Sequence, residues 1–251
     1  MPETGARRVV LLTGAGSGFG RLAAARFAGQ GDKLALCDVN DSSLHSLAEE
    51  LGGEHLIFPC DVSKATRVDR FFDAVIERFG RIDVAVNNAG IAHEQCRLAD
   101  CDDELWSRIL EVNLTGVFLC MKREIRQMQK RGAGRILNIA SVAGVLGAPM
   151  LGPYCASKHG VVGLTRTAAV EYGRQGVRVN ALCPGYSPTP LVAEMLRAGD
   201  EGMESRMTDR IPLKRMAQPE EVVDAILWLC SDQNSFMNGA SIVLDGGLTA
   251  C

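Results

Sequence analysis

A tyrosine and a lysine four residues apart, Tyr154 and Lys158, are the side chains of this sequence best suited to proton transfer. The surrounding residues favour a helix, in which this spacing puts both side chains on one face, about one turn apart. A phenol loses its proton near pH ~10, but a neighbouring ammonium favours the phenolate and lowers the phenol pKa. Tyr154 is therefore a candidate acid and base. By itself such a pair is more often part of a solvated helix face, so the rest of the chain must decide.

A glycine-rich turn follows the first apolar segment of the chain. Residues 8–12 have the length of a strand, residues 13–20 read TGAGSGFG, and an amphipathic helical segment continues to Gly31. Strand, glycine turn and helix start together can hold a phosphate through backbone N–H groups and the helix dipole. The pattern T-G-x-x-x-G-x-G fits, but G-x-G-x-G fits equally well and is found in methyltransferases that bind S-adenosylmethionine. The turn alone therefore leaves a dinucleotide and a methyl donor both open.

An acidic residue ends the second apolar segment, residues 33–37. Asp38 lies eighteen residues past Gly20, where a carboxylate can accept hydrogen bonds from a ribose and would repel a 2′-phosphate. No lysine or arginine lies within the glycine turn, and Val39 follows the aspartate. We therefore expect NAD (NADH) rather than NADP.

Further motifs follow in a fixed order. Asn87-Asn88-Ala89-Gly90 closes the apolar run 82–86, Asn113 lies in a helical run that begins near Glu104, and Ser141 precedes Tyr154 by thirteen residues. Together with the glycine turn, Asp61-Val62 and Pro184-Gly185, they resemble the motif series of the short-chain dehydrogenase/reductase family in order and spacing. The resemblance extends from Arg8 to the Asp245-Gly246-Gly247 segment.

The resemblance implies a role for each catalytic residue. Tyr154 is expected to be the acid and base, and Ser141 to hydrogen-bond the substrate oxygen. Lys158 is expected to hold the nicotinamide ribose and to lower the Tyr154 pKa, and Asn113 to anchor a water molecule in a proton relay. Lowering a phenol pKa from ~10 to ~7 needs about 4 kcal/mol. One cation at ~5 Å supplies roughly 3 kcal/mol in a dielectric of ~20, and oxidised nicotinamide adds a second positive charge.

The remaining motif residues resemble cofactor contacts, in which Tyr154 and Lys158 also take part. The expected contacts are Gly14, Ser17, Gly18, Phe19, Gly20, Asp38, Asp61, Val62, Asn88, Ala89, Gly90, Tyr154, Lys158, Pro184, Gly185, Ser187 and Thr189. Ser187 departs from the family pattern, which commonly has a branched aliphatic residue there, so a backbone contact to the carboxamide is less strongly implied. Asn87 fits two interpretations, support of the cofactor segment or a tie between strands.

The substrate is less well indicated. Candidate contacts are Ser141, Tyr154, His93, Met150, Tyr186, Leu191 and Met195, a mostly apolar set that favours a small or medium secondary alcohol and its ketone. The basic stretch 122–131 supports an alternative, reduction of a 3-oxoacyl group on an acyl-carrier protein. A non-catalytic dinucleotide sensor is a third possibility. No tight arginine pair that would hold a carboxylate lies near the catalytic residues, and Arg97 and Arg206 stay open as candidates.

Apolar, β-branched-rich runs alternate with helical patterns along the whole chain. The expected strands are 8–12, 33–37, 55–59, 82–86, 135–140, 177–183 and 240–244. This alternation predicts an α/β, Rossmann-like doubly wound fold: a seven-stranded parallel sheet with helices on both faces. A length of 251 residues is compatible with one such domain over residues 1–251. Residues 186–216 are irregular and follow a strand end, where ligands bind in such sheets, so we expect a substrate lid there.

Composition narrows the class of partner. A net charge of −3, with a pI near 5.9, suggests neither a nucleic acid nor a membrane surface as partner. The first residues lack the pattern of a secretory signal, and the nine cysteines include no C-x-x-C pair, so we expect reduced thiols and a cytoplasmic protein. The four histidines show no metal-binding spacing. The family resemblance further implies a homotetramer packed through helices near 104–131 and 153–174.

Overall fold

Seven parallel strands form one sheet in the computed structural model, which describes residues 7–198 and 202–250. Their order is β3-β2-β1-β4-β5-β6-β7. The strands are β1 Val9–Thr13, β2 Lys33–Asp38, β3 Leu56–Pro59, β4 Val84–Asn87, β5 Gly134–Ile139, β6 Val177–Pro184 and β7 Ser241–Leu244. All seven expected strands are confirmed, with ends displaced by one or two residues, and so is the doubly wound architecture.

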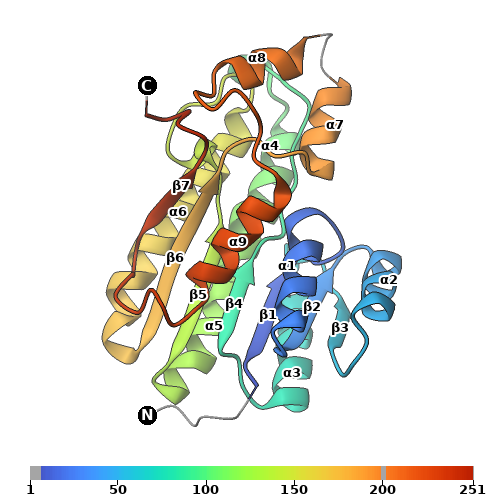
Figure 1. Cartoon of the computed structure of the whole chain (residues 1–251), viewed down its shortest axis with the longest axis vertical. Coiled ribbons are helices and arrows are strands. Elements are labelled where there is room, and N and C mark those ends of the chain that lie inside the picture. Colours follow the sequence, from blue (N-terminus) through green and yellow to red (C-terminus); the bar gives the residue numbers. More distant parts are fainter. Residues whose placement is uncertain (1–6, 199–201, 251) are drawn as a thin grey trace.

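Helices cover both faces of the sheet (Figure 1). The helices are α1 Gly18–Gly29, α2 Asp41–Leu51, α3 Ala65–Phe79, α4 Asp103–Leu110, α5 Gly116–Arg131, α6 Gly152–Tyr172, α7 Pro190–Ala198, α8 Met203–Asp209 and α9 Pro219–Leu229. The apolar residues of α1, α2 and α9 pack in one core, and those of α3, α5 and α6 pack in a second core across the sheet. Strands buried on both faces read as continuous apolar runs, and β1, VVLLT, is buried at every position.

The carboxyl ends of the strands point toward one end of the molecule. In Figure 1, α7 and α8 lie beyond these strand ends, toward the top of the view. The described parts of the segment 186–216, residues 186–198 and 202–216, therefore lie at this end, and their role as a lid stays a prediction. The segment contains a small apolar cluster of its own, formed by Val192, Met207 and Met216, separate from the two main cores.

A buried polar network ties two central strands to two helices. The Asn87 amide Nδ2 donates to Glu124 Oε2 at 3.0 Å and to Asn138 Oδ1 at 2.9 Å, and Asn138 Nδ2 donates to Thr165 Oγ1 at 2.9 Å. All four residues are at most 1% exposed. The network joins β4 and β5 to α5 and α6. Of the two interpretations of Asn87, the structure therefore supports the tie between strands.

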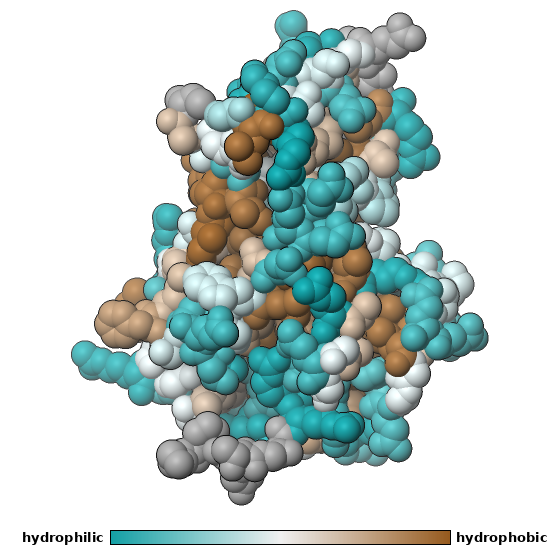
Figure 2. Space-filling model, viewed as in Figure 1, coloured by the Kyte–Doolittle hydropathy of each residue, from teal (hydrophilic) through white to brown (hydrophobic). Residues whose placement is uncertain are grey.

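The surface is polar over most of its area, with apolar side chains gathered in places on the face that carries β7 and α9 (Figure 2). Among the described residues, no helix combines the length and the apolar character needed to cross a membrane. Residues 7–198 and 202–250 also contain no group of three or more side chains arranged to hold a metal ion.

Candidate active site

A cavity of about 620 Å³ lies at the carboxyl ends of the strands. The turns that follow β1 to β6 form its walls, together with parts of α4, α6 and the segment 186–216. Nineteen of the predicted site residues line it: Gly14, Ser17, Gly18, Phe19, Asp38, Asp61, Val62, Asn88, Ala89, Gly90, Ser141, Tyr154, Lys158, Pro184, Gly185, Tyr186, Ser187, Thr189 and Leu191. Residues predicted from separate motifs along the chain are thus brought together around one space.

The turn after β1 needs its glycines for two different reasons. Gly14 and Gly18 have φ angles of +65° and +51°, which side-chain-bearing residues rarely adopt. Gly20 does not line the cavity, but a Cβ atom there would lie 2.0 Å from the Gly14 carbonyl oxygen. Gly20 therefore lets α1 start close against the turn, and a cofactor contact of Gly20 stays a prediction. The resulting turn presents backbone at a helix start, as a phosphate site requires.

Asp38 lies at the end of β2 on the cavity wall. Its Oδ2 accepts a hydrogen bond from the Gly16 backbone N–H at 2.9 Å, and its Oδ1 accepts one from the Asn40 N–H at 2.9 Å. Both oxygens keep lone pairs for further donors. The carboxylate is therefore oriented by the backbone and available to a diol, whereas Val39, 71% exposed, brings no positive charge beside it.

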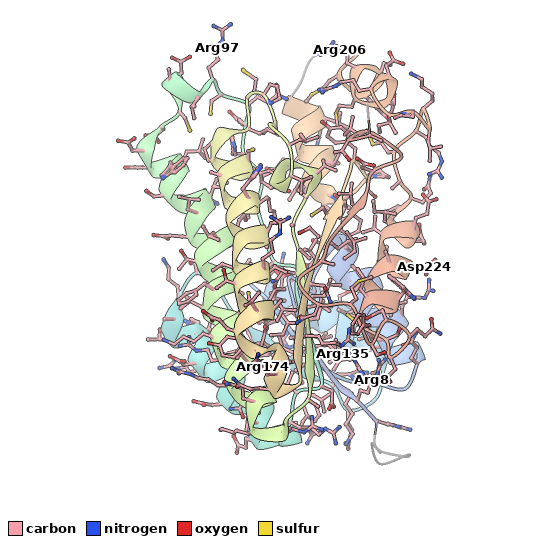
Figure 3. All side chains as sticks on the ribbon, turned by 90° about the vertical axis from the view of Figure 1, so that its left-hand side faces the viewer. Arg8, Arg97, Arg135, Arg174, Arg206 and Asp224 are labelled. Carbon is pink, nitrogen blue, oxygen red and sulfur yellow. The ribbon has the colours of Figure 1, made fainter. Side chains whose placement is uncertain are left out.

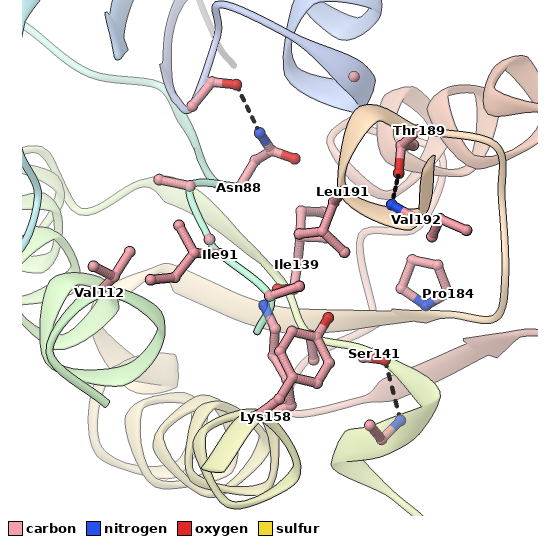
Figure 4. A pocket seen from close by; sticks show the side chains of 18 of the residues that line it. Asn88, Ile91, Val112, Ile139, Ser141, Lys158, Pro184, Thr189, Leu191 and Val192 are labelled. Atoms are coloured by element: carbon pink, nitrogen blue, oxygen red, sulfur yellow. Dashed lines mark hydrogen bonds between the residues drawn. The ribbon is translucent and has the colours of Figure 1, made fainter. Parts of the chain in front are cut away.

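Asn88 lines the cavity, but its side chain ties two turns together. Its Nδ2 donates to the carbonyl oxygens of Thr13 and Gly14, each at 3.0 Å, and Figure 4 shows the amide directed toward this turn. In return, the Thr13 hydroxyl accepts hydrogen bonds from the Asn88 and Ala89 N–H groups. Sequence reasoning missed this role of Thr13, whose signal was a buried hydroxyl at the end of a strand.

Tyr154 and Lys158 lie on α6 as the spacing predicted. The Lys158 Nζ lies 5.6 Å from the centre of the Tyr154 ring and donates to the Ile139 carbonyl oxygen at 2.9 Å. Lys158 is only 4% exposed, and burial lowers the pKa of its ammonium to about 8. In Figure 4, Lys158 and Ser141 approach the cavity from α6 and from the end of β5.

The protonation of Tyr154 differs from the expectation. Burial raises the pKa of the phenol above its ordinary value, and the hydrogen-bonded Ser141 hydroxyl lowers it by a smaller amount. The prediction that Lys158 lowers this pKa therefore fails for these side chains by themselves. The physical reason is that both groups are desolvated, which disfavours phenolate and ammonium alike. The protein alone holds Tyr154 as a neutral phenol, ready to donate a proton.

Asn113 lies behind the cavity wall rather than on it, in a π turn, Glu111–Thr115, between α4 and α5. Its Oδ1 accepts from the Ile91 N–H at 2.8 Å, and its Nδ2 donates to the Ile91 carbonyl at 2.9 Å. A Cβ atom on Gly90 would lie 3.3 Å from Asn113 Oδ1 and 3.5 Å from Lys158 Nζ. These two hydrogen bonds fix the backbone of Ile91, which lines the cavity, and Asn113 lies close to Lys158. π turns inside α-helices are frequent at functional sites.

The segment after β6 completes the wall. Thr189 Oγ1 accepts a hydrogen bond from the Val192 N–H at 3.5 Å, so it orients the start of α7 (Figure 4). Ser187 is 1% exposed, and its hydroxyl has no partner among the described residues. A buried hydroxyl replaces the aliphatic side chain common in the family, and a contact of this segment with a carboxamide stays a prediction.

The substrate candidates divide into two groups. Tyr186 and Leu191 line the cavity, and Figure 4 shows Leu191 among the labelled lining side chains. His93 and Met150 do not line the cavity. The His93 side chain is only 8% exposed, and its Nδ1 lies 2.7 Å from the Glu94 carbonyl oxygen. Met150 has a φ angle of +66°, and the residues on either side of it line the wall. The Met195 side chain lies outside the described residues.

Several lining residues were not predicted as site residues. They include Cys60, Arg108, Glu111, Val112, Ala143, Leu146, Val192, Arg210 and Leu248. Cys60 directly follows β3 and could have been found from its position at a strand end. Arg210 and Leu248 belong to no motif and reach the wall only through the packing of the chain.

The chain is similar to known proteins over nearly its whole length. The sequence model of a family described as enoyl-(acyl carrier protein) reductase matches residues 14–249. A 2,5-dichloro-2,5-cyclohexadiene-1,4-diol dehydrogenase of Sphingobium indicum is 40% identical over 97% of both chains. A cis-4-hydroxycyclohexanecarboxylate dehydrogenase of Sinomonas cyclohexanicum is 40% identical over the full length of both.

Solved structures of similar proteins have the same fold. The crystal structure of a levodione reductase superposes with a TM-score of 0.93 at 39% identity, covering 97% of this chain and 98% of that one. A 3-ketoacyl-(acyl-carrier-protein) reductase from Brucella melitensis, complexed with NADH, superposes with a TM-score of 0.90 at 35% identity over 96% and 98%. With its sheet order, its cavity and these similarities over nearly its whole length, the chain belongs to the short-chain dehydrogenase/reductase family.

Proposed function

We propose that this protein is an NAD-linked oxidoreductase that interconverts a secondary alcohol on a small carbon ring and the corresponding ketone. The observation that carries the proposal is the meeting of Ser141, Tyr154 and Lys158 on the wall of a cavity whose opposite half carries the Asp38 carboxylate. The names of both curated relatives above contain a hydroxylated six-membered carbon ring, which supports a ring alcohol as the substrate class.

The residues present fit a nicotinamide dinucleotide. The glycine turn could offer backbone N–H groups to the pyrophosphate, Asp38 could accept hydrogen bonds from one ribose diol, and Lys158, which also lines the cavity, could hold the second ribose. Asp38 also favours NAD over NADP, because a 2′-phosphate would meet an oriented carboxylate. When bound, the dinucleotide supplies or accepts the hydride.

The protein supplies the proton and the orientation. Ser141 is placed to donate a hydrogen bond to the substrate oxygen, where negative charge gathers in the transition state. Tyr154 gives its proton to that oxygen in ketone reduction and removes it in alcohol oxidation. Lys158 and Asn113 flank Gly90 and would lead the proton onward through a water molecule. The positive charge that oxidised nicotinamide brings would then lower the phenol pKa, which burial alone raises.

Residues 186–216 are proposed to act as a lid. Leu191 and Val192 line the cavity, and the small apolar cluster around Met207 and Met216 is independent of the main cores. A segment packed mainly on itself can move without disturbing the sheet.

A second candidate is reduction of a 3-oxoacyl group on an acyl-carrier protein. It is supported by the NADH-bound structural relative and by the basic stretch 122–131 on α5. Two of those charges are already paired, Arg123 with Asp69 and Arg131 with Asp83, which leaves a weaker surface for an acidic carrier. A sensor without turnover is less well supported, because the complete Ser141, Tyr154 and Lys158 set lines the cavity.

The test is an absorbance assay at the reduced-nicotinamide band, with NAD and NADP and a panel of ring alcohols, open-chain alcohols and a 3-oxoacyl thioester. We expect turnover of a ring alcohol with NAD. Asp38→Ala should raise the relative use of NADP, whereas Asp41→Ala, an exposed aspartate at the start of α2, should not. A wild type that prefers NADP would contradict the assignment of Asp38, and tight NAD binding without turnover of any substrate would favour the sensor.

A further inference from the structure

In the part of the chain that the structure describes, four cationic side chains line the cavity: Lys64, Arg108, Lys158 and Arg210. Lys64 pairs with Glu111 at 3.5 Å, and Lys158 is hydrogen-bonded to Ile139 beside the catalytic tyrosine. Arg210 directly follows α8 and is exposed. Within residues 7–198 and 202–250 its guanidinium has no hydrogen-bond or ion-pair partner. Among the described lid residues it is the one cation on the cavity wall.

The fold places Arg210 in the catalytic half of the cavity. The residues that follow it pack on the turn after β7: the Leu213 N–H donates to the Gly246 carbonyl at 3.3 Å, and a Cβ on Gly246 would lie 2.7 Å from Ile211 Cγ2. Leu248, which follows the same turn, also lines the cavity. In the sheet, β7 is two strands from β5, which leads into Ser141, and lies on the opposite side from β2 and β3.

Among residues 7–198 and 202–250, the acidic side chains of the cavity wall all belong to the other half. The acidic lining residues are Asp38 after β2, Asp61 after β3, and Glu111, which is paired with Lys64. The half that contains Ser141 therefore has positive side chains without a described carboxylate to balance them. A guanidinium presents parallel N–H donors that match a carboxylate, and an unpaired one facing a substrate cavity is suited to bind it.

We propose that Arg210 binds a carboxylate carried by the substrate, so that the preferred substrates are ring alcohols or ketones with an acid group. This inference rests on the proposed function and deepens it. The open candidates from the sequence, Arg97 and Arg206, do not line the cavity. Figure 3 shows both at the same end of the molecule as the lid, with Arg97 directed away from the body.

The test measures binding as well as turnover. Cyclohexanecarboxylate and its neutral counterpart cyclohexanecarboxamide are titrated into the NADH-saturated protein, by calorimetry or by the change in reduced-nicotinamide fluorescence. The wild type should prefer the carboxylate, and Arg210→Gln should bind it about 10-fold more weakly with the carboxamide unchanged. Arg210→Lys, which keeps the charge but not the paired donors, should fall between. Arg206→Gln, one turn earlier on α8, is the matched control and should behave as wild type.

The outcomes separate the inference from the proposed function. A wild type without preference for the carboxylate, or an unchanged Arg210→Gln, overturns the inference. A loss of NADH affinity in Arg210→Gln would assign the guanidinium to the cofactor pyrophosphate instead, and would overturn it too. If the carboxylate preference depends on Arg210 but no ring alcohol is oxidised, the binding site stands and the proposed function fails.

Discussion

Tyr154 and Lys158 share an environment that penalises charge on both. Burial raises the pKa of the phenol and lowers the pKa of the ammonium to about 8, so neither group reaches its working state through the other alone. Ser141 is the side chain that shifts the phenol toward the phenolate. Ketone reduction needs the phenol and alcohol oxidation needs the phenolate. If Tyr154 is the acid and base, as we propose, burial favours the form that ketone reduction uses, and a bound positive charge would favour the form that alcohol oxidation uses.

This argument predicts the pH dependence and the effect of losing the hydroxyl. Alcohol oxidation should speed up as pH rises through the phenol pKa, and ketone reduction should slow down. Tyr154→Phe should lose about 10²- to 10⁴-fold in kcat in both directions and lose this pH dependence. NADH affinity, measured by fluorescence, should stay near wild type. Tyr172→Phe, the same change at the far end of α6, is the control. Undiminished turnover in Tyr154→Phe would remove the acid/base assignment.

Buried polar groups that have no part in the proposed reaction also connect helices to strands. Glu124 on α5 is fully buried, and burial raises the pKa of its carboxyl to about 8, against an ordinary value of 4.5. Its Oε2 accepts from Asn87, whereas its Oε1 has no partner among the described residues. The neutral carboxyl therefore belongs to the network that joins β4 and β5 to α5 and α6.

Protonated Glu124 makes stability depend on pH. Between about pH 4.5 and 8 the folded protein holds a proton that the unfolded chain releases, so this group lowers stability as pH rises, by roughly 1.4 kcal/mol per pH unit. Glu124→Gln keeps the hydrogen-bonding shape and removes the titration. Its stability relative to wild type, from urea unfolding, should rise from pH 5 to pH 8. Glu104→Gln, an exposed change on α4, should show no such trend. A difference independent of pH would contradict the neutral carboxyl.

Three helices on the surface of the molecule carry exposed apolar side chains. Trp106 on α4, Phe118 on α5 and Val170 on α6 are 40%, 47% and 85% exposed. Exposed apolar residues gathered on neighbouring helices are typical of surfaces that pack against another protein. A homotetramer packed through these helices stays a prediction.

Assembly can be measured directly. Sedimentation of the wild type should give the mass of four chains, and Val170→Asp should shift the distribution toward smaller species, because a charge cannot be buried there without a partner. Val170→Ile should sediment as wild type. A wild type at the mass of one chain, 27.0 kDa, would contradict the tetramer.

Much of the secondary structure of this protein could be predicted from local sequence patterns. The seven strands, the glycine turn and the helix that bears Tyr154 and Lys158 follow from apolar periodicity and residue type within short windows, because they depend on neighbours along the chain. The same holds for Asp38, whose position at the end of β2 could be counted from the turn. Asn113 could be predicted from its motif. The π-helical turn that brings its side chain to Ile91 could not be predicted, because the register of a helix depends on how it packs.

Residue types and spacing thus determined the fold and which candidate side chains meet around the cavity. Tertiary structure alone decided three properties of the site: burial outweighs the Ser141 hydrogen bond in setting the Tyr154 pKa, His93 and Met150 do not reach the cavity wall, and Arg210 does reach it. These properties depend on how far a group is removed from water and on which distant segments pack beside it. Neither quantity is written in a local pattern, because both arise only when the whole chain has folded.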